Sequence, residues 1–119
     1  MSRFHQLSLA RCVKVFCTSF DSYDEVIDKY PESKTVLKKL AKDDRCLVAH
    51  SVNATTISRH FPEQRFSEIV FNFPHLGFED LHSHRALVAH YFHSSLECLA
   101  PGGVVTVALS SDQSDKWEM

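Results

Sequence analysis

Apolar residues along the chain fall into runs whose spacing alternates between that of a strand and that of a helix. Four nearly continuous apolar runs, rich in β-branched and aromatic residues, predict buried strands over Val13–Phe20, Arg45–Val52, Phe66–Phe73 and Val104–Leu109. Apolar residues at helical spacing predict a short and a longer helix within residues 24–42, divided at Pro31, and a long helix over residues 78–99. The end of a helix is predicted within residues 4–11, a brief helix or turn over residues 57–61, and a turn at residues 100–103.

This alternation of strands and helices sets the expected fold class. Strands that are apolar along most of their length are typical of a parallel sheet covered by helices on both faces. The chain has 119 residues, of which 44% are hydrophobic and 24% charged, a size and composition that suit one globular domain. We therefore expect a single α/β domain over residues 1–119.

The composition narrows the possible functions. With a formal net charge of -2, the chain has no overall positive charge that would attract a phosphate backbone. Binding of nucleic acid would therefore need a local patch of basic residues. The cysteines lack C-x-x-C spacing and are expected to be reduced thiols: Cys12, Cys17, Cys46 and Cys98. No segment is long and apolar enough to cross a bilayer, and the N-terminus lacks the apolar core of a signal peptide. Cytosol or nucleus is therefore the expected compartment.

Polar residues gather at the predicted strand ends, where ligands of open α/β sheets bind. Asp21 and Ser22 follow the first strand. An acid in that position can accept hydrogen bonds from ribose hydroxyls, but Asp and Ser also cap helices routinely. Asn53 follows the second strand and can contact a nucleoside or cap a local turn. Both interpretations stay open for Asp21 and for Asn53.

The third strand ends in the sequence Asn72-Phe73-Pro74-His75. A proline fixes the backbone, so the neighbouring amide and imidazole would be held in set directions, and the Phe73 ring offers a face for stacking of a planar base. The alternative is an ordinary turn, in which Asn72 satisfies its own backbone and His75 points to water. We favour the first interpretation, a substrate-binding strand end.

Several histidines lie close together within the long predicted helix, namely His82, His84, His90 and His93, and His75 lies upstream of it. His90 and His93 can share a helical face, whereas His82 and His84 cannot. No nearby Cys or acid completes an ordered ligand set. We therefore expect no metal site and a solvated helix surface that carries these histidines.

The polar strand ends belong to a longer pattern of motifs. The segments TSFDS, VNAT, IVFNFPHLG, HRALVAHYFHSSLECLAPGG and VVTVAL resemble, in order and spacing, a Rossmann-like class I methyltransferase domain. That domain is shared by the fungal large-subunit ribosomal RNA uridine-N3 methyltransferase and by ferredoxin-fold anticodon-binding domain-containing proteins. The resemblance covers residues 4–109. It implies a three-layer sandwich with a mostly parallel sheet.

The resemblance also implies an activity and a partner. The expected reaction transfers a methyl group from S-adenosylmethionine to the N3 atom of a uridine in structured RNA, with ribosomal RNA as the substrate. No membrane and no metal would take part. A nucleolus or nucleus location would follow, or otherwise a cytoplasmic one.

Residue roles are implied by the same motifs. Asp21, with Ser22, would bind the ribose of the cofactor. Asn53, with Ala54, would lie beside the adenine, at a position where the family usually has an Asp. Asn72 would contribute to the cofactor site as well as to the methyl-transfer site.

The methyl-transfer site itself would be lined by Asn72, Pro74 and His75. Positioning and desolvation would supply most of the rate enhancement, with a polar group that removes or holds the N3 proton. His75 is the candidate base, because an unperturbed imidazole titrates near neutral pH.

One motif of the family has no counterpart in this sequence. The family begins with a strand and a glycine-rich segment of the type GEGxFSFS, whereas this chain begins MSRFHQLSLAR. That strand would lie between the strands that end at Asp21 and at Asn72, so we expect an incomplete sheet with a gap, which also lacks the C-terminal antiparallel strands. The chain is interpreted as a partial methyltransferase domain. The alternative is a catalytically inactive remnant that serves as a protein or RNA interaction module.

Overall fold

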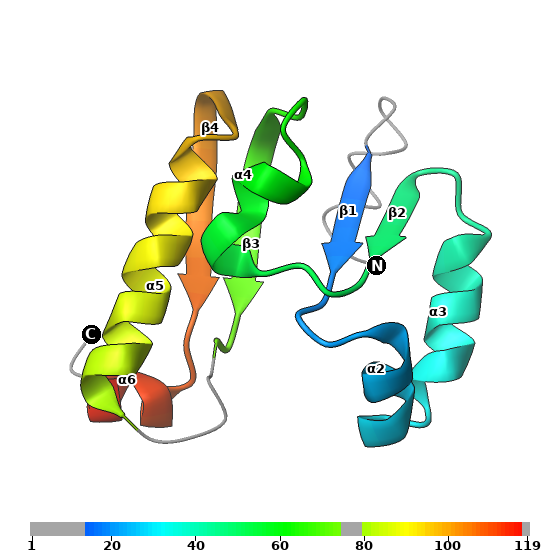
Figure 1. Ribbon diagram of the computed structural model, residues 1–119, viewed down its shortest axis with the longest axis horizontal. Coiled ribbons are helices and arrows are strands. Elements are labelled where there is room, and N and C mark those ends of the chain that lie inside the picture. The colour runs from blue at the N-terminus through cyan, green and yellow to red at the C-terminus, as the bar shows by residue number, and fades with distance from the viewer. Residues whose placement is uncertain (1–13, 75–79, 118–119) are drawn as a thin grey trace. The chain divides into compact units, whose positions relative to one another are not determined.

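The computed structural model describes residues 14–74 and 80–117, and the chain forms two compact units, residues 1–52 and residues 53–119. The helix end that was predicted within residues 4–11 lies outside the described residues. The first unit contains β1 (Val15–Thr18), α2 (Tyr23–Lys29), α3 (Ser33–Ala41) and β2 (Cys46–Ala49) (Figure 1). The second unit contains η1 (Ala54–Thr56), α4 (Ile57–His60), β3 (Phe66–Asn72), α5 (Leu81–Leu96), β4 (Leu99–Ala108) and α6 (Ser111–Trp117).

Over residues 14–52, the first unit consists of two parallel strands and two helices. β1 and β2 pair in a register that runs from Val15 opposite Cys46 to Thr18 opposite Ala49. The helices α2 and α3 are separate because Pro31 interrupts the helical pattern, as predicted. α2 begins at a capping box, in which the Ser22 hydroxyl accepts from the backbone N–H of Glu25 and the Glu25 carboxylate accepts from the Ser22 N–H. α3 packs against β2 in this unit.

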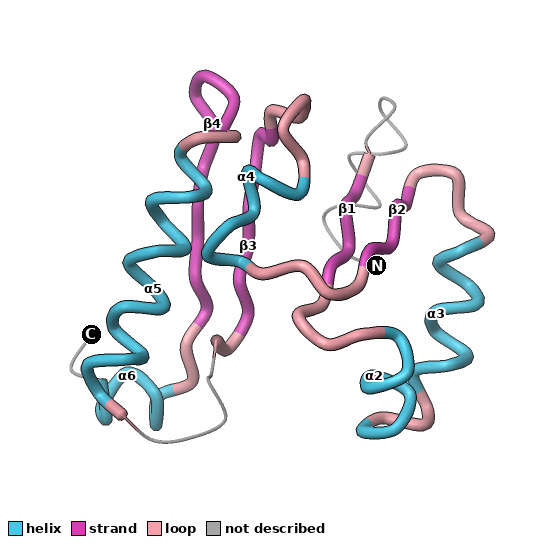
Figure 2. The backbone as a smooth tube through the Cα atoms, viewed as in Figure 1, coloured by secondary structure: helices cyan, strands magenta, loops and turns pink. Residues whose placement is uncertain are grey.

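The second unit is built around one parallel strand pair and the long helix α5 (Figure 2). β3 and β4 are in register from Glu68 opposite Val104 to Asn72 opposite Ala108. The core consists of Ile69, Tyr91 and Cys98, and partly buried apolar side chains of η1, α4, β3 and β4 pack against it. The outward positions Val70 and Val104 are exposed, so α5 covers one face of this strand pair.

Two features of the second unit differ from the sequence-based expectation. Residues 100–103, predicted as a turn, lie inside β4, and the register shifts between the pairs Phe66–Leu99 and Glu68–Val104. β4 uses more residues than β3 over this interval, and Gly102 adopts a positive φ of 77° that favours glycine. The helix α6 was not predicted. It begins with Ser110 and Gln113 bonded in a reciprocal capping box.

The described strands form two separate two-stranded sheets, one from β1 and β2 and the other from β3 and β4. The predicted α/β class, with parallel pairing and an incomplete sheet, is confirmed. Within residues 14–74 and 80–117, no helix is long and apolar enough to cross a membrane.

Tyr91 connects α5 to both strands of the second unit. Its hydroxyl lies 3.1 Å from the carbonyl oxygen of Ile69 on β3 and 2.7 Å from that of Thr106 on β4. Its side chain is 1% exposed, and burial raises the pKa of Tyr91 to about 12. The single hydroxyl proton is therefore shared between two carbonyl groups in a water-poor environment.

Replacement of this hydroxyl yields a prediction at neutral pH. Tyr91→Phe should lower the free energy of unfolding by about 1–2 kcal/mol at pH 7, because the carbonyl oxygens lose a buried donor. Chemical denaturation followed by circular dichroism would measure the loss. Tyr30→Phe is the matched control, since that side chain is 55% exposed and should stay close to wild type.

The raised pKa of Tyr91 yields a second prediction at alkaline pH. The unfolded tyrosine ionises near pH 10 and the folded one near pH 12, so the contribution to stability is complete below pH 10 and is lost between pH 10 and 12. The free energy of unfolding of the wild type should fall by about 1.4 kcal/mol per pH unit more steeply than that of Tyr91→Phe in this window. Equal slopes for the two proteins would contradict the shift.

Candidate functional site

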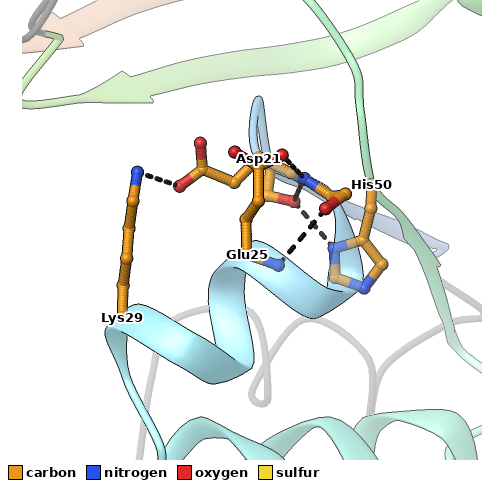
Figure 3. A network of polar contacts seen from close by, with 6 residues as sticks. Asp21, Glu25, Lys29 and His50 are labelled. Carbon is orange, nitrogen blue, oxygen red and sulfur yellow. Dashed lines mark hydrogen bonds and ion pairs between the residues drawn. The ribbon is translucent and has the colours of Figure 1, made fainter.

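The predicted cofactor residue Asp21 lies in the loop after β1, in the first unit. Its Oδ2 atom forms an ion pair with Lys29 Nζ at 2.9 Å, and this contact raises the pKa of Lys29 (Figure 3). Asp21 does not cap α2, because Ser22 fills that position with its side chain. Within the described residues, Asp21 Oδ1 forms no hydrogen bond. One carboxylate oxygen therefore remains as an acceptor for a ligand.

The backbone carbonyl of Asp21 ties this loop to the loop after β2. The oxygen accepts from the Ser51 N–H at 3.1 Å and from Ser19 Oγ at 2.8 Å. Ser51 has a φ of 57°, a conformation that is uncommon for a residue with a side chain, and it directs its N–H at Asp21. Val52 N–H donates to the Ser19 carbonyl at 2.9 Å, so the two strand-end loops share several bonds.

His50 is the residue that sequence reasoning missed in this unit. Its Nδ1 atom lies 2.7 Å from Ser19 Oγ, and its ring meets Tyr23 edge to face with centroids 5.6 Å apart. The second strand was predicted to run to Val52, which placed Asn53 at its end. β2 ends instead at Ala49, so His50 and Ser51 are the residues at its carboxyl end. The sequence signal that could have identified His50 is its place at the end of an apolar run, directly before Ser51 and the pair Val52-Asn53.

Asn53 and Ala54 lie at the start of the second unit. Asn53 Oδ1 accepts from the Thr55 N–H at 2.9 Å and lies 2.7 Å from Thr55 Oγ1, so the side chain caps η1. The side-chain amide nitrogen forms no hydrogen bond with any described residue. Ala54 packs against the core of the second unit. The local capping interpretation therefore holds for the oxygen of Asn53, while its NH₂ group is available to a ligand.

β3 ends at Asn72, and the two residues that follow it, Phe73 and Pro74, are held by backbone hydrogen bonds. Asn72 is the last paired residue, opposite Ala108, and its side chain is exposed. Phe73 has a φ of 49° and a 59% exposed side chain, and its N–H donates to the Ala108 carbonyl at 2.7 Å. Pro74 is buried, and its carbonyl accepts from Gln113 Nε2 at 3.0 Å. The predicted catalytic residue His75 lies outside the described residues.

All four histidines of α5 were predicted to lie at the surface, but one of them does not. His82, His90 and His93 are exposed, but His84 is fully buried in the first turn of the helix. Its Nδ1 atom donates to the Asp80 carbonyl at 2.8 Å, which satisfies that ring nitrogen within the helix start. The prediction of a solvated surface was wrong for His84, because an apolar helical pattern does not show which side chains can bond back to the helix start.

No metal site is found among residues 14–74 and 80–117, where no group of three or more His, Cys, Asp and Glu side chains could hold an ion. The thiols of Cys17, Cys46 and Cys98 are free. Burial raises the pKa of Cys17 and that of Cys98, so both are poor nucleophiles.

Comparison with known proteins gives a family match and plant relatives. A model of the family described as rRNA (uridine-N3-)-methyltransferase BTM5-like matches residues 2–119. Heavy metal-associated isoprenylated plant protein 41 of Arabidopsis thaliana is 38% identical over 104 residues, which is 79% of this chain and 20% of that protein. An uncharacterized protein of Arabidopsis thaliana is 30% identical over 106 residues, which is 80% of this chain and 50% of its own length.

The chain therefore spans between 20% and 50% of the lengths of these curated relatives. No solved structure matches it.

The left-handed backbone of Phe73 yields a stability prediction. A bulky residue at positive φ is strained by about 1–3 kcal/mol, which exceeds the roughly 0.5–1 kcal/mol by which glycine favours the unfolded chain. Phe73→Gly should therefore raise the free energy of unfolding by about 1 kcal/mol relative to Phe73→Ala, which keeps the strain. Thermal denaturation of both variants would measure the difference, and equal stabilities would contradict strain at this position.

Proposed function

This chain belongs to the family described as rRNA (uridine-N3-)-methyltransferase BTM5-like, and on that premise we propose that it is an S-adenosylmethionine-dependent RNA methyltransferase domain. The proposed target is the N3 atom of a uridine in ribosomal RNA. The fold that we propose is a Rossmann-like three-layer sandwich formed by one partial domain, which the parallel pairing within each sheet supports. The observation that carries the proposal is the acidic group at the carboxyl end of β1, in the position where such folds bind a nucleoside.

Asp21 is proposed to bind the ribose of the cofactor. Its Oδ2 atom is paired with Lys29, and its Oδ1 atom is the acceptor that fits a ribose hydroxyl. Ser22 Oγ already accepts from the Glu25 N–H, so its role would be to donate its own hydroxyl proton. Asn53 is proposed to donate from its NH₂ group to the adenine, beside the small side chain of Ala54.

Asn72, Pro74 and His75 are proposed to form the methyl-transfer site. The bound cofactor supplies an electrophilic methyl group. Asn72 presents an exposed amide that can hold a carbonyl oxygen of the uracil, and buried Pro74 fixes the backbone that carries it. The N3 proton must leave as the new N–C bond forms, and His75 is the proposed acceptor of that proton.

Ribosomal RNA is the proposed partner, and a nucleolar or nuclear location follows from that proposal. Because the formal net charge is -2, non-specific electrostatic attraction between the chain and RNA is weak. Recognition would therefore depend on local contacts such as those at the end of β3.

The second candidate function is that of a catalytically inactive interaction module. The observation that favours it is the scarcity of glycine: the 119 residues contain three glycines, and none of them lies in a G-x-G pattern. Glycines let a backbone approach a cofactor closely, so a cofactor contact made by these 119 residues would rest mainly on side chains.

Calorimetric titration of the purified chain with S-adenosylmethionine tests the proposed activity. Wild type should bind, and Asp21→Ala should weaken binding by about tenfold or more, since the lost group accepts hydrogen bonds as an anion. Lys29→Ala is the matched control: it removes the ion-pair partner but leaves the carboxylate, so it should retain binding.

The wild-type chain would then be incubated with labelled S-adenosylmethionine and a ribosomal RNA transcript. Label on uridine N3, lost with Asn72→Ala, would support the enzyme. A folded wild-type chain that binds no S-adenosylmethionine would contradict the enzyme and favour the interaction module.

A further inference from the structure

Ser19 and His50 form a side-chain pair that joins the carboxyl ends of β1 and β2 within the first unit. Ser19 Oγ lies 2.8 Å from the carbonyl oxygen of Asp21 and 2.7 Å from His50 Nδ1. Figure 3 shows His50 beside the loop that carries Asp21. Both side chains are half-buried, so neither contact is an incidental surface approach.

The position of the protons follows from counting donors. A carbonyl oxygen can only accept, so the one hydroxyl proton of Ser19 is directed at Asp21. His50 must then supply the proton of the second contact from Nδ1, since two lone pairs at 2.7 Å would repel. The neutral imidazole is therefore the Nδ1–H tautomer, and its Nε2 atom is a hydrogen-bond acceptor.

This tautomer excludes one function and points to another. Ser19 gives its proton to a backbone carbonyl, so His50 does not activate it as a nucleophile. His50 Nε2 forms no hydrogen bond with any described residue. Tyr23, which packs edge to face on the ring, and Ser19 together hold the imidazole in one orientation. The result is a preorganised acceptor without a partner among the residues that the structure describes.

A second acceptor lies in the same network. Asp21 Oδ1 is unoccupied by described residues, and the Asp21 backbone is bonded to Ser19 and Ser51. Two acceptors at the ends of neighbouring parallel strands suit a ligand with several donors, such as the hydroxyl and amino groups of a nucleoside.

We propose that His50 is a ligand-binding residue of the nucleoside subsite that contains Asp21, and that its Nε2 atom accepts a hydrogen bond from a hydroxyl or amino group of the ligand. Ser19 is a positioning residue, which sets the tautomer and orientation of the ring. This inference rests on the proposed function, because it takes S-adenosylmethionine as the nucleoside-containing ligand.

A pair of near-isosteric substitutions tests the role of each ring nitrogen. The side-chain end of glutamine reaches the position of Nε2, and that of asparagine reaches the position of Nδ1. In calorimetric titrations with S-adenosylmethionine at pH 7.5, His50→Asn should weaken binding by about tenfold, because it keeps the Ser19 contact and removes the acceptor. His50→Gln should stay within about threefold of wild type, because it keeps an acceptor. Circular dichroism would confirm that each variant is folded.

The tautomer is measured separately by ¹⁵N NMR of the imidazole. The neutral imidazole of wild-type His50 should carry its proton on Nδ1, and Ser19→Ala should remove that preference and weaken binding of S-adenosylmethionine. A protonated Nε2 atom in the wild type would overturn the proposal.

The titrations separate failure of this inference from failure of the proposed function. If Asp21→Ala abolishes binding and His50→Asn binds like wild type, the His50 inference is wrong and the cofactor site stands. If folded wild type binds no S-adenosylmethionine, both are wrong.

Discussion

The carbonyl oxygen of Asp21 is the group on which the arrangement of the first unit depends. A half-buried carbonyl has to be paired, and two donors from different segments converge on this one: the Ser19 hydroxyl and the Ser51 N–H. The Ser51 bond is made by a left-handed residue two positions after the last residue of β2. The Ser19 bond uses the only proton of that hydroxyl and thereby fixes the tautomer of His50. One backbone acceptor thus orders both strand-end loops and leaves the Asp21 carboxylate at their surface.

The same physical constraint acts at the end of β3 in the second unit. The Phe73 N–H is paired with Ala108, and the Pro74 carbonyl is paired with Gln113 from α6. With both backbone groups satisfied, the segment holds an exposed amide and an exposed aromatic ring in set directions, at the cost of a strained φ for Phe73. A simple glycine turn would avoid this strain, and the proposed substrate-binding role of the strand end would account for the residues found there.

The sequence predicted the strands and the main helices because their apolar periodicity is strong and because Pro31 divides α2 from α3. It did not predict that β2 ends before His50, since the apolar run continues to Val52 and periodicity does not locate a left-handed residue. The sequence predicted that Asp21 or Ser22 could cap α2, but it did not decide between them. Ser22 is the capping residue, through its reciprocal bonds with Glu25. The burial of His84 depends on a bond to the Asp80 carbonyl that no spacing reveals.

The central claim is that the carboxyl ends of β1 and β2 bind the nucleoside part of a methyl donor. The most direct measurement is a titration of the ¹⁵N-labelled chain with S-adenosylhomocysteine, followed by backbone amide shifts. The account predicts saturable shifts that are largest within the first unit at residues 19–23 and 50–52, where the shared hydrogen bonds lie. Saturating ligand that leaves these amides unchanged, in a chain whose spectrum shows a folded protein, would contradict the account.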